Sequence, residues 1–188
     1  MLQICGIETL LVNLNEYIYS VSQRIYSQQM LKPSTTDTDL RDLAAKFRVP
    51  LNFVGFRNEL PKEPKAGAYI INLQASTDGM GSHWCSFYLA PGKKAFYYDS
   101  MGGLPVEEAL ALMKRWVNAS KCGDQDRLPA DIFINPFNIQ DVDSGFCGQF
   151  AIDFLKTIMH NPTKNGFLNH LHKYKLNLRV QKNVNTNI

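Results

Sequence analysis

The stretch HWCSFYLAPGKKAFYYDS, residues 83–100, decides the fold of this chain. Its two halves, 83–90 and 94–100, are dominated by aromatic and aliphatic side chains, which is typical of strands. The Pro-Gly-Lys-Lys segment between them, residues 91–94, is typical of a tight turn. Two strands joined by a short turn predict an antiparallel hairpin.

The open end of this hairpin carries two residues that could do chemistry. The turn is equidistant from His83 and Asp99, so antiparallel pairing places both residues near the same end. A histidine can act as a general base, and a carboxylate that accepts its second N–H fixes its tautomer. The alternative is that Asp99 only ends the strand. The remaining histidines lie in the polar C-terminal region, where surface histidines are common: His160, His170 and His172.

Cys147 is the predicted nucleophile. It follows Ser144-Gly145, where the backbone can turn sharply, and precedes an apolar helical segment, so it should lie at or near a helix N-terminus. A helix N-terminus and a nearby imidazolium both favour the thiolate, which is the reactive form. Gln140, shortly before Cys147, is placed to add a side-chain amide to an oxyanion hole. Each of these residues taken singly has an ordinary structural explanation, but the predicted catalytic set is His83, Asp99, Gln140 and Cys147.

Further elements are predicted around the hairpin. Residues 68–74 predict another strand, and residues 131–140 predict a strand or extended segment. Residues 53–67, FVGFRNELPKEPKAG, contain prolines and charges and are expected to form a loop. Residues 38–47 predict a short helix, and residues 106–119 predict a second helix. The buried face of that second helix is predicted to consist of Val106, Leu110, Met113 and Val117. Together these elements predict an α+β fold.

The segment before this domain is predicted to be a helical extension, residues 1–37, because apolar residues recur at helical spacing. Residues 38–188 are then a catalytic domain with a basic C-terminal tail. The N-terminus lacks a basic region and its apolar pattern is interrupted by polar residues, which argues against a signal peptide. No apolar run is long enough to span a bilayer, so we expect no membrane association. A reducing compartment is expected.

The number of cysteines and the net charge limit the classes of protein to which this chain can belong. The chain of 188 residues contains four scattered cysteines without a C-x-x-C pair, which argues against a zinc ribbon and a disulfide scaffold. The cysteines other than Cys147 are expected to be ordinary thiols. The formal net charge is +3, and the chain has no acidic residue after Asp153. We expect a solvated basic helix with a frayed end there, and contact with DNA or another polyanion is the alternative.

Three strings of this sequence together resemble a known group of enzymes: GSHWCSFY (81–88), FYYDSMG (96–102) and QDVDSGFCGQF (140–150). Their order of His, Asp, Gln and Cys resembles that of adenovirus-type (adenain-like) maturation cysteine proteases and the related ubiquitin-like-protein-specific proteases. The resemblance covers residues 38–160. It implies a mixed central β-sheet packed between helices, with the catalytic cysteine at a helix N-terminus. The spacing from Gln140 to Cys147 and the acid at Asp99 are similar to those of virophage or polinton-type enzymes.

The resemblance implies a cysteine endopeptidase that cleaves viral capsid precursor proteins during virion maturation, at Gly-Gly-type or small-residue sites. It implies a location in the virion and in the virus factory of the host cell, in the cytoplasm or nucleus. We also expect a monomer that uses no cofactor and no metal. The resemblance also leaves DNA contact through the basic C-terminal region open. The alternatives are a deconjugating protease for ubiquitin-like modifiers and a catalytically inactive peptide-binding module of the same fold.

Overall fold

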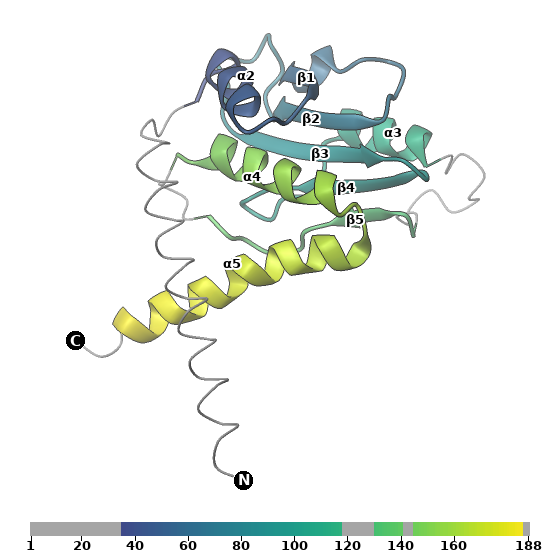
Figure 1. Ribbon diagram of the computed structural model, residues 1–188. Helices are drawn as coiled ribbons and strands as arrows, with labels where there is room; N and C mark the ends of the chain where they lie inside the picture. The colour runs from purple at the N-terminus through teal and green to yellow at the C-terminus, as the bar shows by residue number, and fades with distance from the viewer. Residues whose placement is uncertain (1–34, 118–129, 141–144, 186–188) are drawn as a thin grey trace. The chain divides into compact units, whose positions relative to one another are not determined.

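The computed structural model describes residues 35–117, 130–140 and 145–185, with side chains described as far as Tyr174 (Figure 1). One sheet has the strand order β1-β2-β3-β4-β5. The strands are β1 (Leu51–Phe56), β2 (Gly67–Asn72), β3 (Trp84–Ala90), β4 (Lys94–Tyr98) and β5 (Ile132–Ile134). The outer pairs β1–β2 and β4–β5 are parallel and the inner pairs are antiparallel. The sheet is therefore mixed. The predicted helical extension before residue 35 lies outside the described residues.

The central hairpin of β3 and β4 is confirmed. Its register runs from the pair Ser86–Tyr98 to the pair Ala90–Lys94. Gly92 lies in the turn with a φ of 82°, in the left-handed region that glycine adopts without steric cost. This register brings the chain just before β3 and the chain just after β4 to the same end of the sheet.

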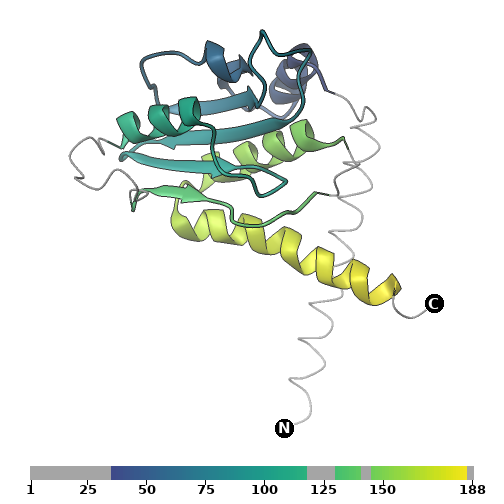
Figure 2. The ribbon, with the colours of Figure 1, turned by 180° about the vertical axis from the view of Figure 1, so that it is seen from behind.

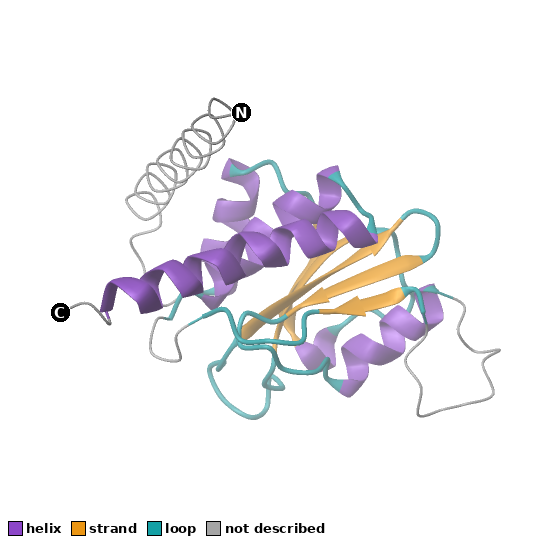
Figure 3. Cartoon of the chain, turned by 90° about the horizontal axis from the view of Figure 1, so that it is seen from below, coloured by secondary structure: helices purple, strands orange, loops and turns teal. Residues whose placement is uncertain are grey.

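Helices cover both faces of the sheet, which confirms the predicted α+β class. They are α2 (Asp37–Lys46), α3 (Glu107–Trp116), α4 (Cys147–His160) and α5 (Lys164–Asn185). Figures 1 and 2 show α4 and α3 on opposite faces of the sheet, and Figure 3 shows α5 on the face away from α3. In the described part of the chain, no helix combines the length and the apolar character needed to cross a membrane.

Two hydrophobic cores result, one on each face. The first lies under α2, α4 and α5 and contains Leu40, Phe96, Tyr98, Phe154 and Phe167 among its buried residues. The second lies under α3 and contains Tyr69, Phe87, Tyr97, Leu112 and Met113 among its buried residues. Alternation along the strands divides them, because successive side chains point to opposite faces. Burial of this much apolar surface holds the hairpin rigid between two layers of helix.

Strand β1 corrects part of the predicted loop at residues 53–67. Leu51–Phe56 pairs in parallel with β2, and Val54 lies opposite Ile70. The side chain of Arg41 in α2 donates a hydrogen bond of 2.9 Å to the Val54 carbonyl. Parallel pairing joins strands through a long connection, so it leaves no short-range turn signal in the sequence. The charged segment that follows β1 therefore dominated the local pattern.

The C-terminal helix α5 corrects the expectation of a solvated helix. Its first half is buried against α4 and the sheet through residues at helical spacing, namely Phe167, His170, Leu171 and Tyr174. His170 is only 2% exposed, so the expectation of a surface histidine is wrong at this position. His160 and His172 are exposed, as predicted.

The buried face of α3 also differs from the prediction. Ala109, Leu112 and Met113 are buried, whereas the other predicted positions, Val106, Leu110 and Val117, are only half-buried. Helical periodicity shows which side of a helix is apolar. Which residues on that side contact the sheet depends on how the helix packs.

Candidate active site

His83 and Asp99 meet at the open end of the hairpin, as predicted. His83 immediately precedes β3 and Asp99 immediately follows β4. His83 Nε2 and Asp99 Oδ1 are 2.6 Å apart, and both side chains are buried. The Leu73 N–H donates to the His83 carbonyl at 3.0 Å, which extends the β2–β3 pairing to the histidine. The imidazole is thus held by backbone pairing on one side and by a carboxylate on the other.

The loop after β4 wraps around the Asp99 carboxylate. The Met101 N–H donates to Oδ1 at 2.8 Å and the Gly103 N–H donates to Oδ2 at 3.1 Å. A side chain on Gly103 would put its Cβ 2.5 Å from Asp99 Oδ2, so the close approach requires glycine. Backbone donors stabilise the ionised form of a carboxylate. This loop therefore fixes both the charge and the orientation of Asp99.

Asn135 fixes the backbone of Asp99 and was missed by the sequence analysis. Its amide oxygen accepts from the Asp99 N–H at 2.8 Å, and its amide nitrogen donates to the Asp99 carbonyl at 2.7 Å. Asn135 follows β5 directly and is fully buried. A buried asparagine after a short strand is a signal for such a role, but the parallel β4–β5 pairing is needed to reveal its partner.

Cys147 is the first residue of α4, which confirms its predicted place at a helix N-terminus. Its Sγ accepts a hydrogen bond from the Trp84 N–H at 3.4 Å and interacts with His83 and with the Gly148 N–H. The thiol is only 9% exposed. The structure thus brings Cys147, His83 and Asp99 into one contiguous set, in which the histidine lies between the thiol and the carboxylate.

The electrostatics of this set favour a charged thiol and a charged imidazole. Burial alone would lower the pKa of His83, but the hydrogen bond that His83 donates to Asp99 and its contact with Cys147 raise it. Burial alone would raise the pKa of Cys147, but His83 and the Trp84 N–H lower it. For Asp99, contact with His83 and the Met101 N–H outweighs burial and lowers the pKa. These opposed shifts are those of a thiolate–imidazolium pair.

Gln140 lies beside this set and its side chain is oriented by Ser100. The Ser100 hydroxyl donates to Gln140 Oε1 at 2.6 Å, and the Gln140 N–H donates to the Ser100 carbonyl at 3.0 Å. Gln140 is buried. Because its oxygen is occupied by Ser100, its amide nitrogen is the group left to donate to another acceptor. Ser100, the residue after Asp99, was not predicted to take part in the site.

Trp84, next to His83, is half-buried and packs against the first core. Its indole N–H donates to the Thr35 carbonyl at 2.8 Å. Thr35 also lies close to the start of α4, because a Cβ added to Gly148 would meet Thr35 Oγ1 at 2.4 Å. Thr35, shortly before α2, therefore lies against both Trp84 and the start of α4.

A second thiol, Cys85, lies against the dyad. Ligand atoms of His83, Cys85 and Asp99 lie within 4.8 Å of one another, which makes them a possible metal-ligand group within the described residues. Two ligands on a tetrahedral zinc ion, with bonds of roughly 2 Å, are separated by roughly 3.3 Å. The 2.6 Å between His83 Nε2 and Asp99 Oδ1 is instead a hydrogen-bond distance. The group as arranged is a hydrogen-bonded cluster, not a preformed metal site.

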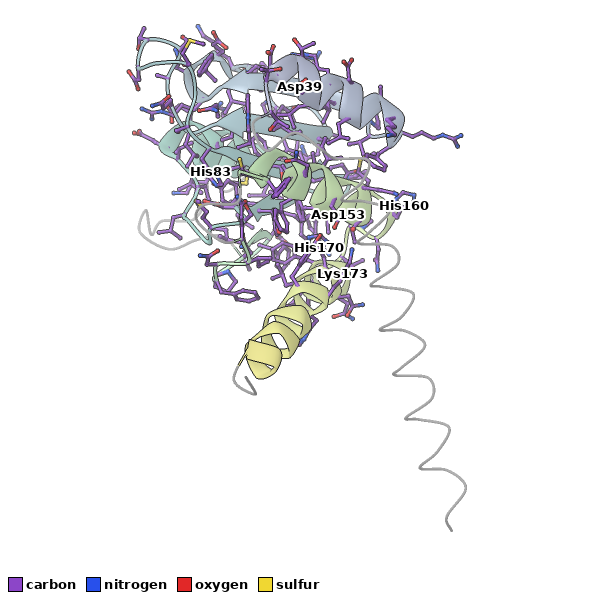
Figure 4. All side chains as sticks on the ribbon, turned by 90° about the vertical axis from the view of Figure 1, so that its left-hand side faces the viewer. Asp39, His83, Asp153, His160, His170 and Lys173 are labelled. Atoms are coloured by element: carbon purple, nitrogen blue, oxygen red, sulfur yellow. The ribbon has the colours of Figure 1, made fainter. Side chains whose placement is uncertain are left out.

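A second group of titratable side chains lies apart from this site. Figure 4 shows His83 separated from Asp153, His170 and Lys173, which lie together where α4 faces α5.

Comparison of the chain with known family models gives no match, and comparison with curated proteins gives no matching relative.

Proposed function

We propose that this protein is a cysteine endopeptidase with Cys147 as nucleophile, His83 as general base and acid, and Asp99 as the residue that orients His83. One observation supports this proposal above the others. A thiol at the first residue of a helix, a buried imidazole and a buried carboxylate 2.6 Å from that imidazole form one contiguous set. A thiolate activated by an adjacent oriented base is the arrangement required for covalent acyl transfer.

The proposed reaction proceeds in two steps. The Cys147 thiolate forms a bond to the carbonyl carbon of the scissile peptide, and the carbon–nitrogen bond breaks as protonated His83 gives its proton to the leaving amine. The product is a thioester. His83 then takes a proton from water, the resulting hydroxide adds to the thioester carbonyl, and the carbon–sulfur bond breaks to release the carboxylic acid and to restore the Cys147 thiolate beside protonated His83.

The negative oxygen formed in each step requires hydrogen-bond donors. The first N–H groups of a helix have no intrahelical partner, so the Cys147 N–H is available at the start of α4. The Gln140 amide is the proposed second donor, and Ser100 turns its oxygen away from that role. Removal of one such donor in comparable enzymes costs about 3–4 kcal/mol of transition-state stabilisation.

The substrates proposed are viral capsid precursor proteins cut at Gly-Gly-type or small-residue sites during virion maturation. This finer proposal is supported by the sequence alone, through the three strings around His83, Asp99 and Cys147 and their resemblance to adenain-like proteases. The geometry of the site is equally suited to any peptide or isopeptide bond that can reach Cys147. Substrate class therefore needs its own experiment.

The test compares three forms of the full chain on a peptide library prepared from a digested proteome, with new peptide termini identified by mass spectrometry. We expect the wild type and the His172→Ala control to produce the same new termini, because His172 is exposed on α5. We expect none from Cys147→Ala. Termini that persist in Cys147→Ala would refute the nucleophile.

A second assay separates the substrate classes. The same three forms are incubated with capsid precursor proteins and with a panel of ubiquitin-like modifier conjugates. Cleavage of the precursors alone supports the maturation protease. Release of modifiers alone would instead make the chain a deconjugating protease. If neither substrate class is cleaved and Cys147 does not react with a thiol-directed electrophile at neutral pH, the inactive binding module is the correct interpretation.

A further inference from the structure

Cys85 occupies a position on the hairpin from which it can reach both members of the dyad. The β3–β4 register ends with Ser86 opposite Tyr98, and one further step places Cys85 opposite Asp99. His83 is two residues before Cys85 and therefore points to the same face. Cys85 is fully buried, and its Sγ, an imidazole nitrogen of His83 and a carboxylate oxygen of Asp99 lie within 4.8 Å of one another.

The Asp99 carboxylate has one acceptor position left for this thiol. An ionised carboxylate offers about four lone-pair positions. His83 and Met101 occupy two positions on Oδ1, and Gly103 occupies one on Oδ2. Cys85 also interacts with Asp99. Burial raises the pKa of Cys85 to about 11, so its sulfur keeps its proton near neutral pH and can act as a donor.

Tyr97 lies behind Cys85 on the same strand face. Its ring is fully buried in the second core. Among the described residues, its buried hydroxyl has no hydrogen-bond partner within normal geometry, and Cys85 is the neighbouring side chain that acts on it electrostatically. A buried hydroxyl without a partner is unfavourable by about 1–3 kcal/mol. The sulfur of Cys85, a weak acceptor, is the partner that this hydroxyl can use.

We propose that Cys85 and Tyr97 are positioning residues of the candidate active site: the Cys85 thiol donates the remaining hydrogen bond to Asp99, and the Tyr97 hydroxyl donates to the Cys85 sulfur. With every acceptor position filled, the carboxylate cannot rotate away from His83, and the imidazole stays oriented towards Cys147. The catalytic meaning of this inference rests on the proposed function, but the arrangement itself can be tested without any substrate.

The substrate-free test uses proton NMR of the full chain. We expect the wild type to show a strongly deshielded imidazole N–H signal from the His83–Asp99 hydrogen bond, assigned by its loss in His83→Ala. In Cys85→Ala this signal should broaden through faster solvent exchange, because the carboxylate can rotate. Cys85→Ser keeps a donor and should restore it. Phe87→Leu, on the same strand face but without a polar group, is the control and should leave it unchanged.

A kinetic test follows for whichever peptide the wild type cleaves. For Cys85→Ala we expect kcat to fall about threefold to tenfold with KM unchanged, since a hydrogen bond to a charged group that orients the base is lost. Cys85→Ser should recover most of kcat. In Tyr97→Phe we expect kcat to fall by a smaller factor than in Cys85→Ala. Phe87→Leu should keep the wild-type kcat.

These outcomes separate the inference from the proposed function. A signal in Cys85→Ala as sharp as that of the wild type would overturn the positioning role, and would make Cys85 an ordinary buried core residue. An inactive wild type with a signal that depends on Cys85 would refute the protease and leave the positioning role intact.

Discussion

At the scale of single residues, Gln140 is the member of the candidate set whose role depends on the most precise orientation. Its amide can donate to an oxyanion only if its oxygen faces elsewhere, and the 2.6 Å contact from the Ser100 hydroxyl ensures this. In the proposed mechanism Ser100 and Gln140 act as a pair, in which only Gln140 would contact the substrate.

For Gln140→Ala we expect kcat to fall by about 10²–10³ with a modest change in KM, which is the usual effect of losing one oxyanion donor. The measurement is steady-state hydrolysis of a peptide identified in the cleavage assay. Ser100→Ala should lower kcat less, because the amide remains but can rotate. An unchanged kcat in Gln140→Ala would remove Gln140 from the site.

The sequence predicted the residues of the site that lie at element boundaries and missed those defined by pairing across space. His83, Asp99 and Cys147 follow from a hairpin and a helix start, which are local patterns. Asn135 and Ser100 gain their roles only when β5 and residues 139–140 lie beside Asp99 and Ser100. Cys85 looked like an ordinary thiol because a strand pattern does not show what lies opposite each residue.

At the scale of elements, α5 carries a buried histidine in an aromatic environment. The His170 ring makes edge contacts with Tyr98 of β4, Phe154 of α4 and Tyr174 of its own helix. Neither ring nitrogen has a hydrogen-bond partner among the described residues. The charged groups that act on it are Asp153 and Lys173, and Asp153 is itself bonded to the Tyr174 hydroxyl. The helix is thus docked through a side chain that must stay neutral.

Stability should therefore fall as the pH is lowered. Burial, only partly offset by Asp153, lowers the pKa of His170 from 6.5 to about 4. Between these two values the unfolded chain binds the proton and the folded chain does not, so the contribution is complete above pH 6.5 and is lost as the pH falls to about 4. The shift corresponds to about 3 kcal/mol.

The measurement is urea unfolding at pH 7.5 and pH 5 for three chains. We expect His170→Phe to lose much less stability at pH 5 than the wild type does. His172→Ala is the control, because His172 is exposed on the same helix, and it should behave as the wild type. If His170→Phe and the wild type lose equal stability on acidification, His170 is not the titrating group.

The loop after β4 also requires a second glycine, Gly102. Gly102 has a φ of 75°, and an added Cβ would lie 2.6 Å from the Phe137 carbonyl carbon. Gly92 has a similar φ of 82° but has no atom within 4 Å of an added Cβ. The two positions share the backbone strain and differ in the steric clash.

We expect Gly102→Ala to destabilise the fold more than Gly92→Ala. The conformation alone costs roughly 1–2 kcal/mol in both, and overpacking adds about 1–3 kcal/mol at Gly102. Chemical denaturation of the two variants measures the difference. Gly102→Ala should also lower kcat, since residues 137–138 lead into Gln140. Equal destabilisation of the two variants would show that the Phe137 segment yields without cost.

Prediction of the elements succeeded where the signal was local in the sequence. It failed where tertiary packing determined the pairing or the burial of an element. The hairpin and α4 have clear periodicity of apolar residues, and their observed ends lie at or near the predicted ones. Strand β1 was obscured because its partner β2 is parallel and lies after a charged connection. The first half of α5 appeared solvated because lysines and asparagines lie between the residues that it buries. The spacing of Phe167, His170, Leu171 and Tyr174 nevertheless carried the signal.

At the scale of the whole molecule, one sheet separates two cores, and the chain has a tryptophan at each. Trp84 packs against the core under α4, and Trp116 packs against the core under α3. The chain contains two tryptophans, so each can be studied alone. Because both cores use the same strands, we expect them to unfold together.

Truncation of a side chain in one core should therefore lower the urea midpoint measured by the fluorescence of the tryptophan in the other core. In a Trp116→Phe background, Leu112→Ala should lower the urea midpoint of Trp84 fluorescence, although Leu112 lies on the opposite face. In a Trp84→Phe background, Phe154→Leu should lower the midpoint of Trp116 fluorescence. Leucine-to-alanine truncation costs about 2–5 kcal/mol in a packed core. A midpoint that does not move in either background would mean that the two faces unfold independently.

The arrangement of the site along the chain also sets the order in which it can be completed. The bond between His83 and Asp99 joins positions separated by 16 residues, whereas the bond between Trp84 and Cys147 spans 63. Short-range contacts close sooner because less chain entropy is lost. On a ribosome, the base and its acid can therefore assemble before the nucleophile has been synthesised. The proposed protease activity would then be delayed during translation, so that the growing chain could not cut itself or its neighbours. Cys147 in stalled nascent chains should react with electrophiles only after α4 has emerged.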